Sequence, residues 1–126
     1  MLKAKQIDHV NMSVKNLAES VRFYNRLFGF EVLKEQPHKN SMIIGNKTVK
    51  LCLYEEPVHY TKNRGAINHF GLNVENFDEI LKVCKSMNVT VRYGGIRQWE
   101  KSRSLYIEDP NGYEIELTEK AGGDLG

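Results

Sequence analysis

The chain has 126 residues, of which 40% are hydrophobic and 27% charged, so its size and composition fit one globular domain and exclude a disordered protein. The net charge is only +2, from 18 basic and 16 acidic residues in mixed order, which excludes the strong positive patch of a nucleic-acid-binding protein. No uncharged apolar run is long enough to cross a bilayer.

The first half of the sequence predicts a strand, a helix and three further strands. Residues 6–14 alternate between apolar and polar side chains, which is typical of a strand. Asn16, followed three residues later by Glu19, predicts the start of a helix, and Gly29 predicts its end. The later strands are expected at about 30–36, 40–45 and 48–54.

The second half repeats this pattern at a spacing of sixty residues. Ile7 and His9 match Ile67 and His69, and apolar positions continue to match without a gap through the following segment. We therefore expect a strand at about 66–74 and a helix that begins at Asn76. The later strands are expected at about 89–93, 103–108 and 113–118.

This repetition predicts one domain, 1–126, made of two βαβββ modules. Module 1 covers about 5–54, a linker covers 55–65, and module 2 covers about 66–119. One helix covers only one face of a four-stranded sheet, so the other face of each sheet remains open. The fold class is α+β, with two cupped mixed sheets and the helices outside.

The open faces carry a set of polar residues that can bind a metal. Strand alternation places His9, His69 and Glu116 away from the apolar, helix-packed side. Two imidazoles and a carboxylate suit a divalent metal, and three protein ligands leave positions open for a substrate. A histidine on a polar strand face is more often simply solvated, and spacing alone leaves both interpretations open.

The cysteines and the start of the sequence bear on location. Cys52 and Cys84 are too few for a disulfide scaffold or a cysteine-rich zinc site. Residues 1–6 contain no apolar core of a secretory signal. We therefore expect a cytoplasmic protein whose partner is a small molecule rather than a nucleic acid or a membrane.

Four segments of the chain resemble the vicinal oxygen chelate superfamily: residues 7–10, 20–30, 67–70 and 106–117. The superfamily includes glyoxalase I, fosfomycin-resistance proteins, extradiol dioxygenases, methylmalonyl-CoA epimerase and bleomycin-binding proteins. The resemblance implies paired βαβββ modules, a homodimer, and one divalent metal ion (Zn, Ni, Mn or Fe(II)). It also places His9, His69 and Glu116 on the metal-ligand positions of the superfamily.

The resemblance leaves several functions open. A glyoxalase-like lyase or isomerase and a fosfomycin-type thiol transferase both use a metal that chelates two neighbouring oxygens of a small substrate. Glyoxalase I has an additional glutamate ligand on the last strand of its first module, where this chain has Lys50, Cys52 and Tyr54, with Glu55 just beyond. Extradiol dioxygenases have a catalytic histidine at a place that residues 97–99 occupy here without one.

A metal-free binding protein of the bleomycin-resistance type is the alternative from another functional class. Such a protein sequesters a small molecule in a groove between subunits and needs no metal ligands. The retained His, His, Glu set favours the enzyme.

Strand alternation and the resemblance together assign further roles. Tyr106 is expected to donate a proton or a hydrogen bond to a bound oxyanion beside Glu116, although a core-lining tyrosine would show the same pattern. Glu114, on the same strand face as Glu116, is expected to accept a hydrogen bond from a ligand or to act as an alternative ligand. The residues expected to bind the substrate are Asn11, Cys52, Arg97, Lys101 and Ser104. For Cys52, a buried apolar role is the simpler interpretation, and for Arg97 and Lys101 it is a solvated loop.

Overall fold

A computed structural model describes residues 1, 3, 5–55, 67 and 69–121 and confirms the α+β fold class. The chain divides into two compact units, Met1–Lys62 and Asn63–Gly126, and each contains one four-stranded sheet. The linker predicted at 55–65 lies outside the described residues except for Glu55, which ends a strand. No helix within the described ranges is long and apolar enough to cross a membrane.

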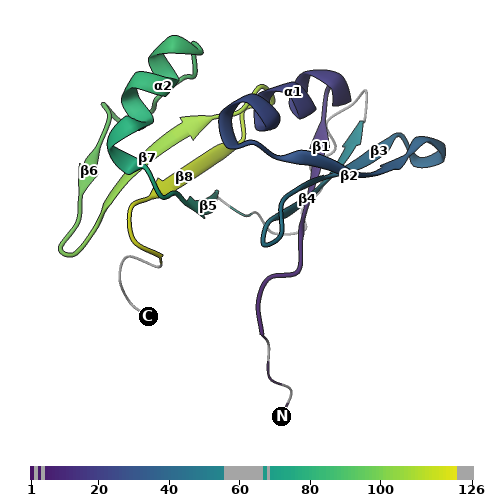
Figure 1. Cartoon of the computed structure of the whole chain (residues 1–126), viewed down its shortest axis with the longest axis horizontal. Helices are drawn as coiled ribbons and strands as arrows, with labels where there is room; N and C mark the ends of the chain where they lie inside the picture. The colour runs from purple at the N-terminus through teal and green to yellow at the C-terminus, as the bar shows by residue number, and fades with distance from the viewer. Residues whose placement is uncertain (2, 4, 56–66, 68, 122–126) are drawn as a thin grey trace. The chain divides into compact units, whose positions relative to one another are not determined.

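The first unit has the element order that the sequence predicts (Figure 1). Its elements are β1 (Val10–Val14), α1 (Leu17–Phe28), β2 (Glu31–Gln36), a short 3₁₀ helix (Pro37–Lys39), β3 (Ser41–Gly45) and β4 (Lys50–Glu55). The strands lie in the order β1-β4-β3-β2, in which β1 and β4 are parallel and the other pairs antiparallel.

The second unit repeats the same sheet (Figure 1). Its elements are β5 (Phe70–Asn73), a 3₁₀ helix (Phe77–Glu79), α2 (Ile80–Ser86), β6 (Arg97–Gln98), β7 (Arg103–Glu108) and β8 (Glu114–Thr118). The strand order β5-β8-β7-β6 is that of the first unit, again with one parallel pair, β5 and β8. The repeated order confirms that the chain consists of two βαβββ modules.

The two helices begin in different ways, and the prediction that Asn76 caps the second helix was wrong. The Asn16 side chain accepts a hydrogen bond from the Glu19 amide at 2.8 Å, so it caps α1 as predicted. Asn76 makes no such bond, and the chain first forms a 3₁₀ turn before α2 begins at Ile80. The Asn76 backbone, with φ −108° and ψ 56°, lacks the extended conformation of the Asn16 cap, which has φ −148° and ψ 116°.

The prediction of a strand at 89–93 was also wrong. Only an isolated bridge joins Val91 to Ile107, and the fourth strand of the second sheet is instead the two-residue β6. Tyr93, Gly94 and Gly95 have positive φ angles of 56°, 77° and 109°. Three consecutive residues in this conformation cannot continue a strand, so they turn the chain before β6.

The core of each unit lies on one side of its sheet. Side chains alternate along β7 and β8, so four apolar ones are at most 2% exposed, namely Leu105, Ile107, Ile115 and Leu117. The alternate positions carry polar side chains, among them Ser104, Tyr106, Glu114 and Glu116. This second set forms the polar face on which the candidate site lies.

Candidate metal centre

The structure brings His69 and Glu116 together on the polar face of the second sheet. His69 directly precedes β5, and the parallel register pairs the next residue but one, Gly71, with Glu116 of β8. His69 Nε2 lies 3.0 Å from Glu116 Oε1. This is a hydrogen-bond distance. Neighbouring donors of a tetrahedral Zn²⁺ site are about 3.4 Å apart, so a small shift of either side chain would let both reach one ion.

His9, the third predicted ligand, has the corresponding place in the first module. It directly precedes β1, as His69 precedes β5. Both histidines were predicted to lie within strands, but in the structure each strand begins at the residue after the histidine. The exposed His9 ring has its Nδ1 2.9 Å from a carboxylate oxygen of Asp8. Among the residues that the structure describes, no group of three or more His, Cys, Asp or Glu side chains is in place to hold a metal. The participation of His9 therefore stays a prediction.

A second carboxylate lies on the other side of the His69 ring. His69 Nδ1 is 3.4 Å from Glu114 Oε2. The Glu114 side chain is only 7% exposed, and it accepts hydrogen bonds from the Tyr93 hydroxyl and from Arg92 Nη1, the latter at 3.0 Å. The Tyr93 hydrogen bond and the Arg92 charge hold the pKa of Glu114 below its ordinary value, against the opposing effect of burial.

Arg92 and Tyr93 are site residues that the sequence did not indicate. They lie in the segment predicted to be a strand, and an isolated pair of residues such as these shows no site pattern. The Gly94–Gly95 doublet was the available signal, since paired glycines mark a turn. A turn at this point would have placed Tyr93 in a loop next to the sheet.

Tyr106 lies beside His69 and Glu116, two of the three predicted ligands. Its ring packs edge-on against the His69 ring with 5.4 Å between centroids, and β7 pairs it with Glu116 of β8. Burial, together with the nearby Glu116 carboxylate, raises the pKa of Tyr106. Its hydroxyl therefore keeps its proton at neutral pH.

The predicted anion-binding residues lie at β6 and the turn that follows it. The Arg97 guanidinium is 5.7 Å from the centroid of the Tyr93 ring and 6.0 Å from that of the Trp99 ring. Trp99 Nε1 donates a hydrogen bond of 2.6 Å to Ser104 Oγ, so the indole is fixed to β7. Lys101 is exposed in the same turn. An exposed cation held between two aromatic rings is suited to bind an anionic group of a substrate.

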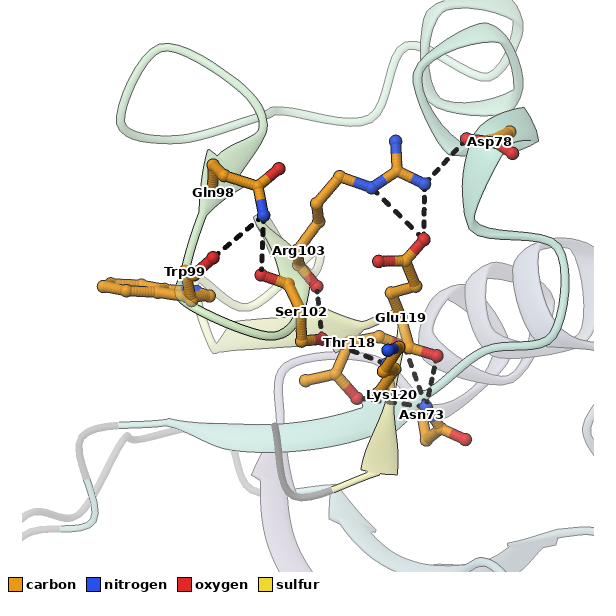
Figure 2. Close-up of polar contacts among 9 residues, drawn as sticks. All are labelled: Asn73, Asp78, Gln98, Trp99, Ser102, Arg103, Thr118, Glu119 and Lys120. Atoms are coloured by element: carbon orange, nitrogen blue, oxygen red, sulfur yellow. Dashed lines mark hydrogen bonds and ion pairs between the residues drawn. The ribbon is translucent and has the colours of Figure 1, made fainter. Parts of the chain in front are cut away.

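A polar cluster supports this turn where it meets the start of β7 and the end of β8 (Figure 2). Arg103 donates hydrogen bonds to Glu119 at 2.5 Å and to Asp78 at 2.8 Å. Gln98 Nε2 donates to the Trp99 carbonyl at 2.9 Å, and Ser102 Oγ accepts from the backbone N–H of Lys120 at 3.1 Å. The cluster ties the strand ends to the helical segment and gives the turn a fixed shape.

A sequence model described as the Glyoxalase/Bleomycin resistance protein/Dioxygenase superfamily matches residues 6–117. The chain belongs to this superfamily. The resemblance of the sequence is therefore confirmed at the level of the family and of the fold.

Two curated relatives and one solved structure show the range of proteins to which this superfamily member is similar. The chain is 28% identical to metallothiol transferase FosB of Staphylococcus saprophyticus over 90% of its own length and 76% of the relative. It is 26% identical to a trivalent organoarsenical cleaving enzyme of Bacillus sp. (strain MD1) over 86% and 70%. Its fold matches an integron cassette protein from the Halifax Harbour sewage outfall metagenome with a TM-score of 0.74 and 28% identity, over 91% and 98% of the two chains.

The register of the two sheets identifies the counterpart of Glu116 in the first module of this superfamily member. Val10 of β1 pairs with Leu51, as Phe70 of β5 pairs with Ile115, so Cys52 corresponds to Glu116. Cys52 is buried, with its Sγ 3.9 Å from Ser41 Oγ, and its strand partner Asn11 is exposed.

Glu55 does not supply a carboxylate in its place. It ends β4 three residues after Cys52, so alternation places it on the opposite face of the sheet. Its Oε2 accepts a hydrogen bond of 2.8 Å from the Leu17 amide. The carboxylate therefore satisfies the first turn of α1. Among the described residues of β4, Glu55 is the only acidic one, so this strand presents no carboxylate on the polar face.

Proposed function

We propose that this chain is a divalent-metal-dependent enzyme in which His9, His69 and Glu116 hold the ion. The observation that carries the proposal is the 3.0 Å approach of His69 Nε2 to Glu116 Oε1 on adjacent strands. The donor set of imidazole and carboxylate accepts Zn, Ni, Mn or Fe(II). When bound, such an ion supplies Lewis acidity to two neighbouring oxygens of a small substrate.

The remaining residues of the polar faces bind and orient that substrate. Tyr106 donates a hydrogen bond to an oxygen that becomes negative during the reaction, because its hydroxyl stays protonated at neutral pH. Arg97 and Lys101 bind an anionic group of the substrate at the β6 turn. Three further side chains are assigned to substrate binding in this proposal: Asn11, Cys52 and Ser104.

Among the reactions of the superfamily, thiol transfer to a small anionic electrophile is the one we propose. A glyoxalase-like lyase requires a carboxylate as proton-transferring base on the last strand of the first module, and the corresponding residue here is Cys52. A relative of 28% identity is named a metallothiol transferase. The organoarsenical cleaving relative makes a trivalent arsenical a second substrate to test.

The proposal includes an assembly and a location. We expect a homodimer in which both modules form one domain, as the superfamily resemblance implies. We also expect a cytoplasmic protein, because a reducing compartment keeps Cys52 and Cys84 as the free thiols that the structure shows. Light scattering coupled to gel filtration measures the mass and would contradict the dimer if it gave one chain.

Metal content tests the site directly. The protein is purified without chelators, and bound metal is measured by elemental analysis in the wild type, in His69→Ala and in His38→Ala. The exposed His38 lies on the short helix of the first module and serves as the control. We expect near-stoichiometric metal in the wild type and in His38→Ala, and loss of it in His69→Ala. A wild type without metal would support the binding protein instead.

A substrate panel then tests the reaction. The metal-loaded protein is assayed with fosfomycin and a thiol, a hemithioacetal, a catechol and a trivalent organoarsenical. We expect thiol-dependent consumption of the anionic electrophile, reduced in Tyr106→Phe and in Arg97→Gln. Turnover of the hemithioacetal alone would replace the transferase by the lyase.

A further inference from the structure

We infer that Glu114 is a positioning residue that fixes the tautomer and orientation of His69 as a metal ligand. This inference rests on the proposed function, because His69 has to be a ligand for its orientation to matter. It adds a residue whose task the superfamily membership does not define. The argument starts from the two nitrogens of one imidazole ring.

The His69 ring lies between two carboxylates that play different parts. Nε2 lies 3.0 Å from Glu116, whereas Nδ1 lies 3.4 Å from Glu114. Glu116 is part-exposed and Glu114 is buried. An ion can therefore approach the Nε2 side together with Glu116, while Glu114 remains behind the ring as an acceptor.

Such an arrangement matches the chemistry of histidine as a ligand. A neutral imidazole has one N–H and one lone pair, and the group that accepts from the N–H decides which nitrogen binds the metal. A carboxylate behind the ring fixes the tautomer and makes the ligating nitrogen more basic. In the metal-free structure Glu116 lies within hydrogen-bond distance of Nε2 and competes for the ring proton. Once Nε2 binds an ion, the proton lies on Nδ1, where Glu114 accepts it.

Glu114 is itself held in place by Arg92 and Tyr93. In the β7–β8 register it lies opposite Glu108, and two like charges at this position would destabilise the sheet. Arg92 lies between them, with Nη1 3.0 Å from Glu114 and Nη2 3.2 Å from Glu108. The Arg92 amide also donates to the Tyr106 carbonyl at 2.8 Å, which fixes its backbone to β7.

Tyr93 completes the support at a conformational cost. Its φ of 56° lies in the left-handed region, which is unfavourable for a bulky side chain. This backbone places its hydroxyl on Glu114 Oε1 and its ring against Tyr106. Hydrogen bonds from Arg92 and Tyr93 thus fix one oxygen of Glu114, and the other faces His69.

The first experiment measures metal affinity by competition with a chromophoric chelator, with Zn²⁺ as the probe. Glu114→Gln keeps the shape of the side chain and removes its charge. We expect the dissociation constant to rise about 10- to 100-fold, the usual effect of losing such a partner of a ligand. Glu108→Gln is the matched control, because Glu108 binds the same arginine from the opposite strand. The affinity of this variant should change by less than about 3-fold.

A milder variant guards against a folding defect. Tyr93→Phe removes one hydrogen bond to Glu114 and leaves the carboxylate, so a rise of about 2- to 5-fold is expected, below the effect of removing the charge. Circular dichroism and thermal unfolding establish that each variant is folded. Equal affinities in Glu114→Gln, Glu108→Gln and the wild type would overturn the inference.

The second experiment needs no metal and so separates the inference from the proposed function. Long-range ¹H–¹⁵N spectra of the metal-free protein report which nitrogen of His69 carries the proton. Because Glu116 competes for the ring proton at Nε2, the spectra are recorded in the Glu116→Ala background. We expect a protonated Nδ1 in Glu116→Ala and in Glu116→Ala/Glu108→Gln, and a mixture of tautomers in Glu116→Ala/Glu114→Gln. A wild type that binds no Zn²⁺ would refute the proposed function alone, whereas a spectrum that Glu114→Gln leaves unchanged in this background would refute the role of Glu114.

Discussion

The two modules have the same strand order, yet their polar faces carry different chemistry. By register, Cys52 of the first module corresponds to Glu116 of the second, and Lys50 corresponds to Glu114. Both modules keep a histidine directly before the first strand. The backbone repeat thus preserves the place of each side chain, but only the last strand of the second module has carboxylates at these two positions.

The helix-packed sides differ as well. Helix α1 has twelve residues and buries Tyr24, whose ring stacks on Phe30 with 6.3 Å between centroids. Helix α2 has seven residues, and Cys84 takes the place of Tyr24 at the repeat spacing of sixty. The first core therefore depends on one large aromatic side chain at a position where the second has a small one.

The largest expected effect tests this difference between the cores. Tyr24→Ala removes a ring that is 0% exposed and should lower the free energy of unfolding by about 3–5 kcal/mol, as for other buried aromatic residues. Cys84→Ala removes one sulfur atom from an equally buried site and should cost about 1 kcal/mol. Urea unfolding followed by circular dichroism measures both. Similar losses would show that the two cores do not differ in this way.

A second variant makes the two last strands alike. Cys52→Glu places a carboxylate in the first module where Glu116 lies in the second. Cys52 is 8% exposed, and burial of a polar group without matched partners should lower the free energy of unfolding by about 1–3 kcal/mol. Cys52→Ala, with an expected loss of about 1 kcal/mol, is the control for the missing sulfur.

The same variant sharpens the proposed reaction. If the absence of a carboxylate at this position excludes lyase chemistry, metal-loaded Cys52→Glu should turn over a hemithioacetal faster than the wild type. Cys52→Ala should not. Unchanged hemithioacetal turnover in both variants would remove the argument that Cys52 decides between the two reactions.

The alternation of side chains made most of the fold predictable from the sequence. The repeat of His9 and His69, the helix between Asn16 and Gly29, and the strands at 103–108 and 113–118 all depend on local patterns, and the structure has them within a few residues. Local patterns failed where the backbone adopts left-handed angles, as at Tyr93. A strand of only two residues, β6, is too short to show alternation.

The candidate site was only partly predictable, for a different reason. Alternation placed Glu114 and Glu116 on one face of β8, but their approach to His69 depends on the register between β5 and β8. The contact of Arg92 with Glu114 spans 22 residues of sequence and depends on a turn that only the Gly94–Gly95 doublet indicates in the sequence. Sequence reasoning can therefore name the face on which a residue lies, while its partners across strands come from the structure.

A smaller effect is expected at the helix starts. Asn16→Ala removes the hydrogen bond to the Glu19 amide and should lower the free energy of unfolding by about 1 kcal/mol. Asn76, at the same place in the second module, caps nothing with its side chain, so Asn76→Ala should change it by less than about 0.5 kcal/mol. Thermal unfolding of both variants measures the difference. Equal losses would mean that the asparagines matter through their backbone conformations.

The smallest expected effect concerns pH, and it distinguishes two carboxylates of the acidic second module. The pKa of Glu114 is lowered by Tyr93 and Arg92, and the pKa of Glu119 by Arg103. Since each folded pKa lies below that of the unfolded chain, each contribution to stability is complete above the ordinary value of 4.5 and is lost as the pH falls through the folded pKa.

Glu114→Gln and Glu119→Gln should therefore each flatten the decline of stability with acid, measured as the urea midpoint between pH 7 and pH 3. Glu114→Gln should have the larger effect, because the Glu114 side chain is 7% exposed and that of Glu119 is 30% exposed, where water screens the ion pair. The two effects should add in the double variant, since different arginines bind the two carboxylates. If both single variants lose stability at low pH as the wild type does, groups other than Glu114 and Glu119 cause that loss.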